Sequence, residues 1–421
     1  MRLRSFVLAV VSLVSCTQFA SAEDWPEFRG PTGQGHSTAT GLPVEWSSTQ
    51  NVAWKQAING TGWSSPVVSD GRIYLTSAVR SQTGPQLSLR ALGLDAATGR
   101  VLWDSEVFAS DAFIQIHSKN SQASPTPVVE RGRLYVHFGH HGTACLNLDG
   151  QVLWRNPDLK YPPVHGNGGS PVIADNALIF NCDGGSDPFV VALNKTNGKV
   201  LWKVDRTTDA AKTFSFSTPL MITLNGQKQL ISPGSNRVCA YDPKDGREIW
   251  RVRYDGYSVI PRPVFGHGLV FIGTGFDRPT VMAIRPDGQG DVTETHVSWT
   301  LSRGAPNTPS LLLVGRELYM VSDAGIASCV DALTGRMHWQ ERIGGNCSAS
   351  PIYADGKIYL QNEPGLGVVL EAGKEFRKLA SNALEERTLA SYAVSDGALF
   401  IRTEKHLYRI QAETARSQAS P

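Results

Sequence analysis

Short runs of alternating apolar and polar residues, separated by glycine-containing turns, recur along most of the chain. In one unit, Asp70-Gly71 separates an opening apolar run from the run Arg72-Ile73-Tyr74-Leu75-Thr76, and a third run follows at residues 90–94. Asp-Gly between two such runs is typical of a tight antiparallel hairpin. The turn from Asp95 to Gly99 then leads into a fourth run that ends at Trp103. The pattern therefore predicts a four-stranded antiparallel unit.

This unit is repeated eight times along the chain. Most units open with Ser or Thr followed by Pro, as at Ser65-Pro66 and Thr126-Pro127, and most end in tryptophan. The spacing between successive tryptophans is 40 to 51 residues, which is typical of repeat architectures. The tryptophans that end a unit are Trp54, Trp103, Trp154, Trp202, Trp250, Trp299 and Trp339.

Eight four-stranded units predict an all-β fold, a single eight-bladed β-propeller with antiparallel blades. The last unit stops at Ile410 after three strands, whereas residues 51–54 supply one strand without the other three. Pairing of these two ends would close the ring and remove unpaired sheet edges. We therefore expect a signal peptide at 1–22, an N-terminal extension at 23–50, the propeller at 51–412 and a flexible tail at 413–421.

The charge balance argues against a nucleic-acid partner. The 421 residues carry a formal net charge of +2, and residues 1–22 contain Arg2 and Arg4 but no acidic residue. The remainder is therefore formally neutral, and it has no run of Lys and Arg that would attract a phosphate backbone.

The first 22 residues have the features of an export signal. A basic start is followed by an apolar stretch from Phe6 to Val14 and by the small-residue cleavage motif Ala20-Ser21-Ala22. Leu13-Val14-Ser15-Cys16 also fits a lipobox, so a lipid anchor at Cys16 is the alternative route. No later apolar run reaches the length of about 18 residues that a membrane span needs. We expect an exported protein of the periplasm or cell envelope, soluble or tethered by lipid.

The cysteines do not indicate a disulfide framework. Cleavage after residue 22 leaves five cysteines, an odd number. Cys145, Cys239 and Cys329 each lie just before a turn and a tryptophan, where cysteine behaves as a small buried hydrophobic residue.

The turn between the last two strands carries a family resemblance. Asp95 to Trp103 and Asp331 to Trp339 both read Asp-x-x-Thr-Gly-x-x-x-Trp, and the units at residues 50–412 resemble the pyrroloquinoline quinone-like (PQQ-like) β-propeller repeat. The resemblance implies that the seven tryptophans dock between blades; the unit at residues 374–379 has none. Residues 24–31 with Gly33-Gln34-Gly35 are similar to the start of exported bacterial members, and we expect them to form a packed N-terminal clasp.

That family contains quinone-dependent dehydrogenases and also non-catalytic members such as the assembly scaffold BamB. The chain lacks the adjacent Cys-Cys pair of the dehydrogenases, and the asparagines near the expected channel have no clear partner carboxylates for calcium. The chain therefore resembles the BamB-like, non-dehydrogenase members, and we expect neither a cofactor nor a metal. PQQ with calcium is the alternative.

Candidate ligand-binding residues lie in the loops that lead into each unit, which should line one mouth of the channel. They could bind a peptide, a sugar or a small anion, with Arg262 and Arg303 gripping a carboxylate or phosphate. They could equally satisfy backbone groups around a water-filled channel. The candidates are Trp63, Asn120, His165, Asn167, Phe214, Tyr257, Arg262, Arg303, Asn307 and Asn346.

Three histidines, His137, His140 and His141, raise the question of a metal site. Residues three apart on a strand point to opposite faces, so we expect a solvated hairpin end instead. No Gly-x-Ser-x-Gly motif or phosphate-binding loop is present, and no catalytic residue is predicted. The expected function is an exported, non-catalytic binding or scaffolding module whose partner is an envelope protein, a peptide or a carbohydrate. The alternatives are a PQQ-dependent oxidoreductase with an atypical site and a carbohydrate- or peptide-binding propeller.

Overall fold

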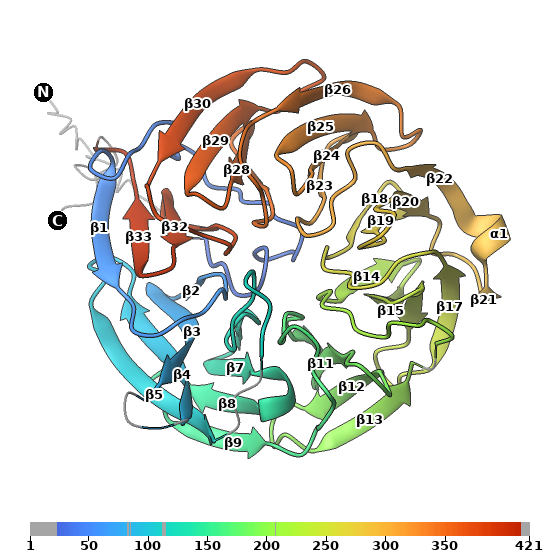
Figure 1. The fold of residues 1–421 in the computed structure, drawn as a ribbon, viewed down its shortest axis with the longest axis horizontal. Coiled ribbons are helices and arrows are strands. Elements are labelled where there is room, and N and C mark those ends of the chain that lie inside the picture. Colours follow the sequence, from blue (N-terminus) through green and yellow to red (C-terminus); the bar gives the residue numbers. More distant parts are fainter. Residues whose placement is uncertain (1–22, 82–83, 85, 112–114, 207, 414–421) are drawn as a thin grey trace, which may run out of the picture.

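The computed structural model describes residues 23–81, 84, 86–111, 115–206 and 208–413. Their strands form eight antiparallel sheets arranged radially about one axis (Figure 1). The predicted eight-bladed, all-β propeller is thus confirmed. The expected signal peptide, Cys16 and residues 414–421 of the expected tail lie outside the described residues.

Each blade runs from an inner strand beside the axis to an outer strand at the rim. The first four blades are β2 (Val67–Ser69), β3 (Arg72–Arg80), β4 (Leu87–Asp95) and β5 (Val101–Ser110); β6 (Val128–Glu130), β7 (Arg133–His137), β8 (Thr143–Asn147) and β9 (Val152–Asn156); β10 (Val172–Ala174), β11 (Ala177–Cys182), β12 (Phe189–Asn194) and β13 (Val200–Asp205); and β14 (Leu220–Leu224), β15 (Gln227–Gly234), β16 (Arg237–Tyr241) and β17 (Glu248–Arg253). A short 3-10 helix, η1 (Gly139–His141), interrupts the second blade.

The other four blades repeat this order with one insertion. They are β18 (Val264–Gly266), β19 (Leu269–Gly273), β20 (Val281–Ile284) and β22 (Val297–Leu301); β23 (Leu312–Val314), β24 (Glu317–Val321), β25 (Ile326–Asp331) and β26 (Met337–Arg342); β27 (Ile352–Ala354), β28 (Lys357–Gln361), β29 (Leu366–Glu371) and β30 (Lys378–Ala383); and β31 (Ala393–Ser395), β32 (Ala398–Arg402), β33 (His406–Ile410) and β1 (Val52–Ala57). The insertion in the fifth blade holds β21 (Gly290–Asp291), which pairs in parallel with β17, and α1 (Thr293–His296).

The two ends of the propeller meet in the eighth blade. β1 pairs antiparallel with β33, and Lys55 lies opposite Tyr408 in this register. Figure 1 shows β1 beside β33 at the rim. The predicted closure by the N-terminal strand is confirmed, and it leaves no blade with an unpaired outer edge created by the chain ends.

Tryptophans of the outer strands join neighbouring blades. The indole N–H of Trp103, for example, donates to the Leu148 carbonyl in the turn before the last strand of the next blade, at 2.9 Å. Gly150 of that turn has a φ of +84°, and a Cβ there would lie 2.6 Å from the Trp103 ring. The turn motif therefore needs glycine for both its conformation and this close packing. The equivalent bonds run from Trp54 to Ala96, Trp154 to Lys195, Trp202 to Pro243, Trp299 to Ala332 and Trp339 to Gly373, at 2.9–3.1 Å.

Two blades depart from this arrangement. Trp250 is fully buried and donates to the Gln229 side chain at 2.9 Å, and Gln229 in turn donates to the Pro286 carbonyl at 3.0 Å. The connection to the fifth blade is therefore made through the Gln229 side-chain amide, because the insertion in that blade changes the turn before its last strand. In the seventh blade, which lacks a tryptophan, Trp46 of the N-terminal extension stacks on Tyr359 with ring centroids 6.4 Å apart.

The five described cysteines are buried and unpaired in disulfides. Cys145, Cys239 and Cys329 are at most 1% exposed, so the prediction that they act as small core residues is confirmed. Burial raises the pKa of the Cys145 and Cys239 thiols to about 11.

Candidate binding site in the central channel

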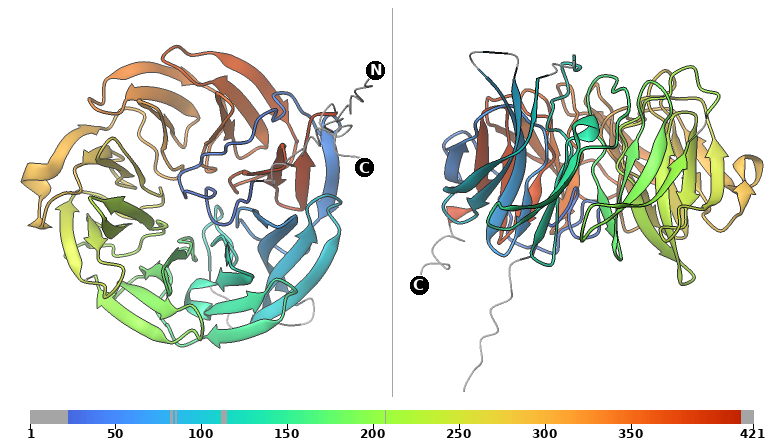
Figure 2. Two further views of the ribbon diagram at one scale, coloured as in Figure 1. Left: turned by 180° about the vertical axis from the view of Figure 1, so that it is seen from behind. Right: turned by 90° about the horizontal axis from the view of Figure 1, so that it is seen from below.

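The N-terminal extension crosses the axis and closes the channel toward the face that carries the Asp-Gly hairpins, which we call the hairpin face. Trp25 and Val68 of β2 exchange main-chain hydrogen bonds of 2.8 and 2.9 Å. Across the ring, His36 forms a parallel bridge with Tyr353 of β27. Figures 1 and 2 show this blue segment crossing the centre of the ring. Residues 24–31 and 33–35, expected to form a packed clasp, therefore belong to a segment, residues 24–38, that forms a plug in the channel.

Arg262 fastens the plug to the fifth blade. Its side chain is 2% exposed, and its guanidinium donates to the Phe28 carbonyl and, at 2.9 Å, to Glu27 Oε2. A third bond, of 3.1 Å, runs from Nε to the Pro219 carbonyl. This corrects the expectation that Arg262 is available to a ligand at the channel mouth, because the side chain is buried and its guanidinium is bonded to the plug and to the Pro219 carbonyl.

Above the plug lies a cavity of about 410 Å³ that opens toward the opposite face; we call it the cup. The loops that precede the first strand of each blade, the leading loops, contribute lining residues from all eight blades. Phe28 of the plug and Phe276, from the loop between β19 and β20, complete the lining. Its volume is within the range of about 300–1,000 Å³ typical of ligand pockets.

Seven hydroxyl groups form a ring in the cup. Each accepts a hydrogen bond of 2.9–3.2 Å from the backbone N–H of the equivalent residue in a neighbouring blade. The ring is interrupted once, at Arg262, which is the equivalent residue of the fifth blade. Its members, the hydroxyl ring, are Ser65, Thr126, Ser170, Thr218, Ser310, Ser350 and Ser391.

Aromatic side chains form a continuous arc along one wall of the cup. His117 and His165 contact each other edge to face with centroids 5.5 Å apart, and His165 contacts Phe214 at 5.3 Å. Phe214 then contacts Tyr257 at 5.6 Å, and Tyr257 contacts Phe276 at 6.4 Å. Partial burial and the neighbouring His117 lower the pKa of His165. We call these five residues the aromatic arc.

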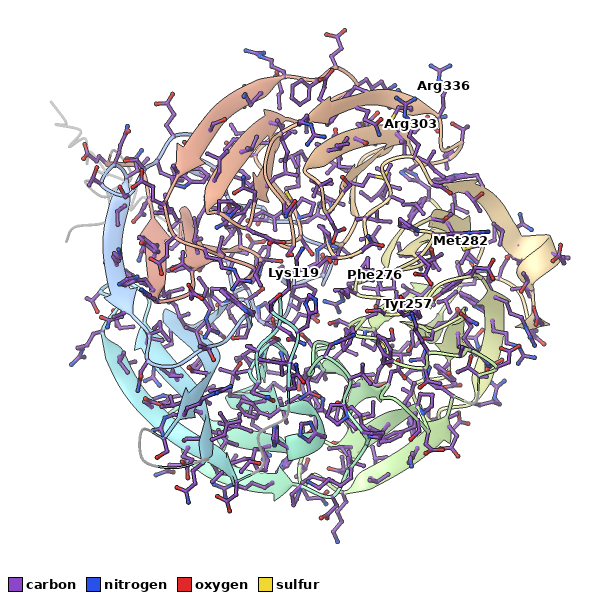
Figure 3. All side chains as sticks on the ribbon, viewed as in Figure 1. Lys119, Tyr257, Phe276, Met282, Arg303 and Arg336 are labelled. Atoms are coloured by element: carbon purple, nitrogen blue, oxygen red, sulfur yellow. The ribbon has the colours of Figure 1, made fainter. Side chains whose placement is uncertain are left out.

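The opposite wall is built by a loop that reaches across the ring. Lys119, in the leading loop of the second blade, forms an ion pair of 2.7 Å with Glu363 of the seventh blade. Arg387, in the leading loop of the eighth blade, donates to the Ser118 carbonyl at 2.7 Å and lies 5.5 Å from the Trp63 ring centroid. Figure 3 shows Lys119 near the centre of the ring, together with Tyr257 and Phe276.

Half of the sequence-derived candidates lie on the cup. Its lining includes Trp63, Asn120, His165, Phe214 and Tyr257. The Asn120 amide also ties two leading loops together, because it donates to the His165 carbonyl at 2.8 Å.

The remaining candidates lie elsewhere, Arg262 among them as described above. Asn167 is buried between the second and third blades, where it accepts a bond of 3.0 Å from Tyr161. Arg303 is exposed, bonds Gln340 at 2.8 Å and points to the rim in Figure 3. Asn307 and Asn346 belong to leading loops, but the cup is lined by Thr308 and Ser348 beside them. The expected joint grip of Arg262 and Arg303 on an anion is therefore incompatible with their positions.

Several lining residues were not predicted. Phe28 reaches the cup from the plug, and Phe276 from a loop between two strands, so neither belongs to the leading loops that were searched. Lys119 and Phe216 do belong to those loops, but nothing in their spacing distinguishes them. The hydroxyl ring did leave a signal, namely the Ser or Thr that opens most units, which was used only to count the blades.

The three histidines of the second blade are buried. His137, His140 and His141 are 2%, 9% and 8% exposed, and the His140 and His141 ring centroids are 3.8 Å apart. The expectation of a solvated hairpin end is thus wrong, because η1 folds this loop inward. Within the described part of the chain, no three His, Cys, Asp or Glu residues are placed to hold a metal ion.

The cup does not offer the ligands that calcium requires. Calcium takes six to eight oxygen ligands and relies on Asp or Glu carboxylates. None of the described residues that line the cup carries a carboxylate. Glu363 is engaged by Lys119 and Ser348, and Asp323 by Thr308 and the backbone N–H of Asn307. The donor set therefore does not fit a calcium-dependent quinone site. Separately, no helix among the described residues is long and apolar enough to cross a membrane.

The fold and repeat define a PQQ-like β-propeller, and comparison with known proteins identifies the branch. The family described as "Outer membrane protein assembly factor BamB" matches residues 36–181 and 92–340, more than half of the chain. The chain belongs to this family. It is 22% identical to the outer membrane protein assembly factor BamB of Yersinia pestis over 419 residues, covering 97% of this chain and 88% of that protein.

Two solved structures share the fold. BamB from Moraxella catarrhalis superposes with a TM-score of 0.60 at 12% identity, covering 86% of this chain and 97% of that one. The computationally designed Ika8 protein superposes with a TM-score of 0.56 at 12% identity, covering 88% of this chain and 100% of that one.

Proposed function

We propose that this protein is an exported, non-catalytic module of the bacterial cell envelope that binds a segment of another protein in the cup. The observation that carries the proposal is a concave site built by the leading loops of all eight blades, with an aromatic arc on its wall. Aromatic side chains with a few convergent polar groups are typical of sites that bind peptides and other small ligands. The relatives are named as protein assembly factors, which supports a protein partner.

The chemistry of the lining supports a binding role over catalysis. A serine nucleophile needs a base within hydrogen-bond reach. Among the described residues, no hydroxyl of the hydroxyl ring is bonded to His117 or His165, and each accepts a backbone N–H instead. Within the described ranges, no residue that lines the cup carries the carboxylate that a calcium-dependent quinone site needs.

Export rests on the sequence of residues 1–22. The mass and first residue of the mature protein distinguish the two processing routes: cleavage after Ala22 gives Glu23 as the first residue, and lipobox processing gives a lipidated Cys16. A mature protein that retains residues 1–22 in unmodified form would contradict export by either route.

Crosslinking tests the cup directly. A photo-crosslinking amino acid placed at position 276, at the cup, should attach to polypeptides in the cell envelope. The matched control is position 333, because Phe276 and Leu333 are similarly exposed, at 38% and 40%, and Leu333 belongs to a turn of the hairpin face. Equal crosslinking at both positions would contradict a protein-binding cup. So would stoichiometric binding of PQQ with calcium, seen as quinone absorbance and a raised melting temperature.

A further inference from the structure

We infer that the cup recognises an aromatic carboxylate, presented as the free C-terminal end of a polypeptide whose last residue is aromatic. This inference rests on the proposed function and specifies which part of the partner enters the cup. It follows from the unused donors of the hydroxyl ring, the charge of the floor and the closure by the plug.

The hydroxyl ring presents hydrogen-bond donors. A hydroxyl has one O–H donor and two acceptor lone pairs. Each of the seven hydroxyls uses a lone pair to accept a backbone N–H, and none of them donates to another described residue. Seven O–H groups in the lining of the cup therefore have no acceptor among the described residues. A carboxylate, which has two oxygens and only accepts, matches such a set.

The charges at the floor also favour an anion. Arg29 lies close to Arg262, whose carboxylate partner is Glu27, whereas Asp24, the other carboxylate of the plug, is bonded to Ser69 and to the backbone N–H of Asp70. Arg29 is fully buried, donates to the Pro351 carbonyl at 3.3 Å, and has no partner for its Nε and Nη1 atoms among the described residues. Its positive charge therefore has no carboxylate partner of its own. A negative ligand group above the plug would be attracted to it.

The shape of the cup favours a chain end. The plug closes the channel below, so a polypeptide cannot thread through the ring. The wall offers Phe214, Tyr257 and Phe276, and the floor offers Phe28, which suit an aromatic ring in edge-to-face contact. An aromatic residue at the very end of a chain places its ring and its carboxylate together at the tip, where they can meet the aromatic arc and the hydroxyl ring.

The decisive experiment compares one peptide in two forms. The mature protein is titrated with a fluorescein-labelled hexapeptide that ends in phenylalanine, with a free carboxylate or with a C-terminal amide. Hydrogen bonds to a charged acceptor are about twice as strong as neutral ones, so we expect about tenfold tighter binding of the free acid. Equal affinity would overturn the carboxylate inference and leave the proposed protein-binding function standing. Failure of both forms, and of an internal-sequence peptide library, would overturn the proposed function itself.

Two further arms identify the source and the site. N-acetylphenylalanine should compete with the peptide but bind more weakly; if it binds as tightly as the peptide, the ligand is a small aromatic acid and the chain-end inference is overturned.

Ser391→Ala removes one donor of the hydroxyl ring and should reduce the preference for the free acid over the amide. Ser395→Ala is the matched control, a buried serine of the same inner strand region that does not line the cup. Phe276→Ala, at an exposed position, should weaken both peptide forms without unfolding the protein.

Discussion

Arg262 and Glu27 form an ion pair of 2.9 Å between the fifth blade and the plug, although 235 residues separate them in the sequence. The Arg262 side chain is almost fully buried and that of Glu27 is 22% exposed. Together with the bridges from Trp25 to Val68 and from His36 to Tyr353, the pair holds the plug that forms the floor of the cup. It also explains why the repeated Ser or Thr is replaced by arginine in this one blade.

Arg262→Met should destabilise the protein by about 3 kcal/mol, because removing one partner of a buried ion pair leaves the other uncompensated. Urea-induced unfolding measures this loss, and limited proteolysis within residues 24–38 reports release of the plug. Arg303→Met is the matched control at an exposed position and should change the free energy of unfolding by no more than about 0.5 kcal/mol. Equal stability of the two variants would show that the plug does not depend on Arg262.

The tryptophan contacts between blades lead to a second prediction. Trp103→Ala should lower the free energy of unfolding by about 3 kcal/mol, because it removes the ring that packs on Gly150 and Tyr74 and the bond to Leu148. Val101→Ala, on the same strand and 37% exposed, is the control and should cost about 0.5 kcal/mol or less. A change near zero for Trp103→Ala would mean that the indole does not join the blades.

The fold could be predicted because the blades repeat one sequence pattern of strands, turns and, in most units, a closing tryptophan. A turn motif that recurs with its tryptophan identifies a strand pair even where single copies vary. The exceptions depended on distant residues: Gln229 bridges Trp250 to the next blade, and Trp46 packs on Tyr359 in the blade that lacks a tryptophan. The bond from Gln229 to Pro286 joins two repeats, and Trp46 lies outside the repeats, so neither contact follows from the pattern of a single repeat.

The site was predictable only in outline. Trp63, His165 and Tyr257 could be predicted to lie at the channel mouth because the propeller fold places the leading loops there. The role of Arg262 could not be predicted, since the plug residues that its guanidinium binds, Glu27 and Phe28, lie outside the repeats. A single loop sequence also does not reveal whether a side chain faces the axis, as with Asn120, or a neighbouring blade, as with Asn167.

The buried histidines of the second blade make stability depend on pH. Burial lowers the pKa of His137 and His141 to about 3 and that of His140 to about 4. In the unfolded chain a histidine titrates near pH 6.5. Below this pH the unfolded state binds protons that the folded state excludes. The free energy of unfolding should therefore fall as the pH is lowered from about 6.5 toward 4, by up to about 1.4 kcal/mol per pH unit for each histidine.

His137→Gln separates this titration from simple loss of packing. His137 forms a hydrogen bond of 2.8 Å with Thr143, and its ring centroid lies 4.2 Å from that of Phe180. The variant should therefore be less stable at pH 8, where the imidazole is neutral in both states. Between pH 6.5 and 5, however, its stability should fall less steeply than that of the unsubstituted protein, since one excluded proton has been removed. Urea unfolding at pH 8, 6.5 and 5 measures both effects. Parallel pH dependences of the two proteins would show that His137 is protonated in the folded state and that its burial does not exclude the charge.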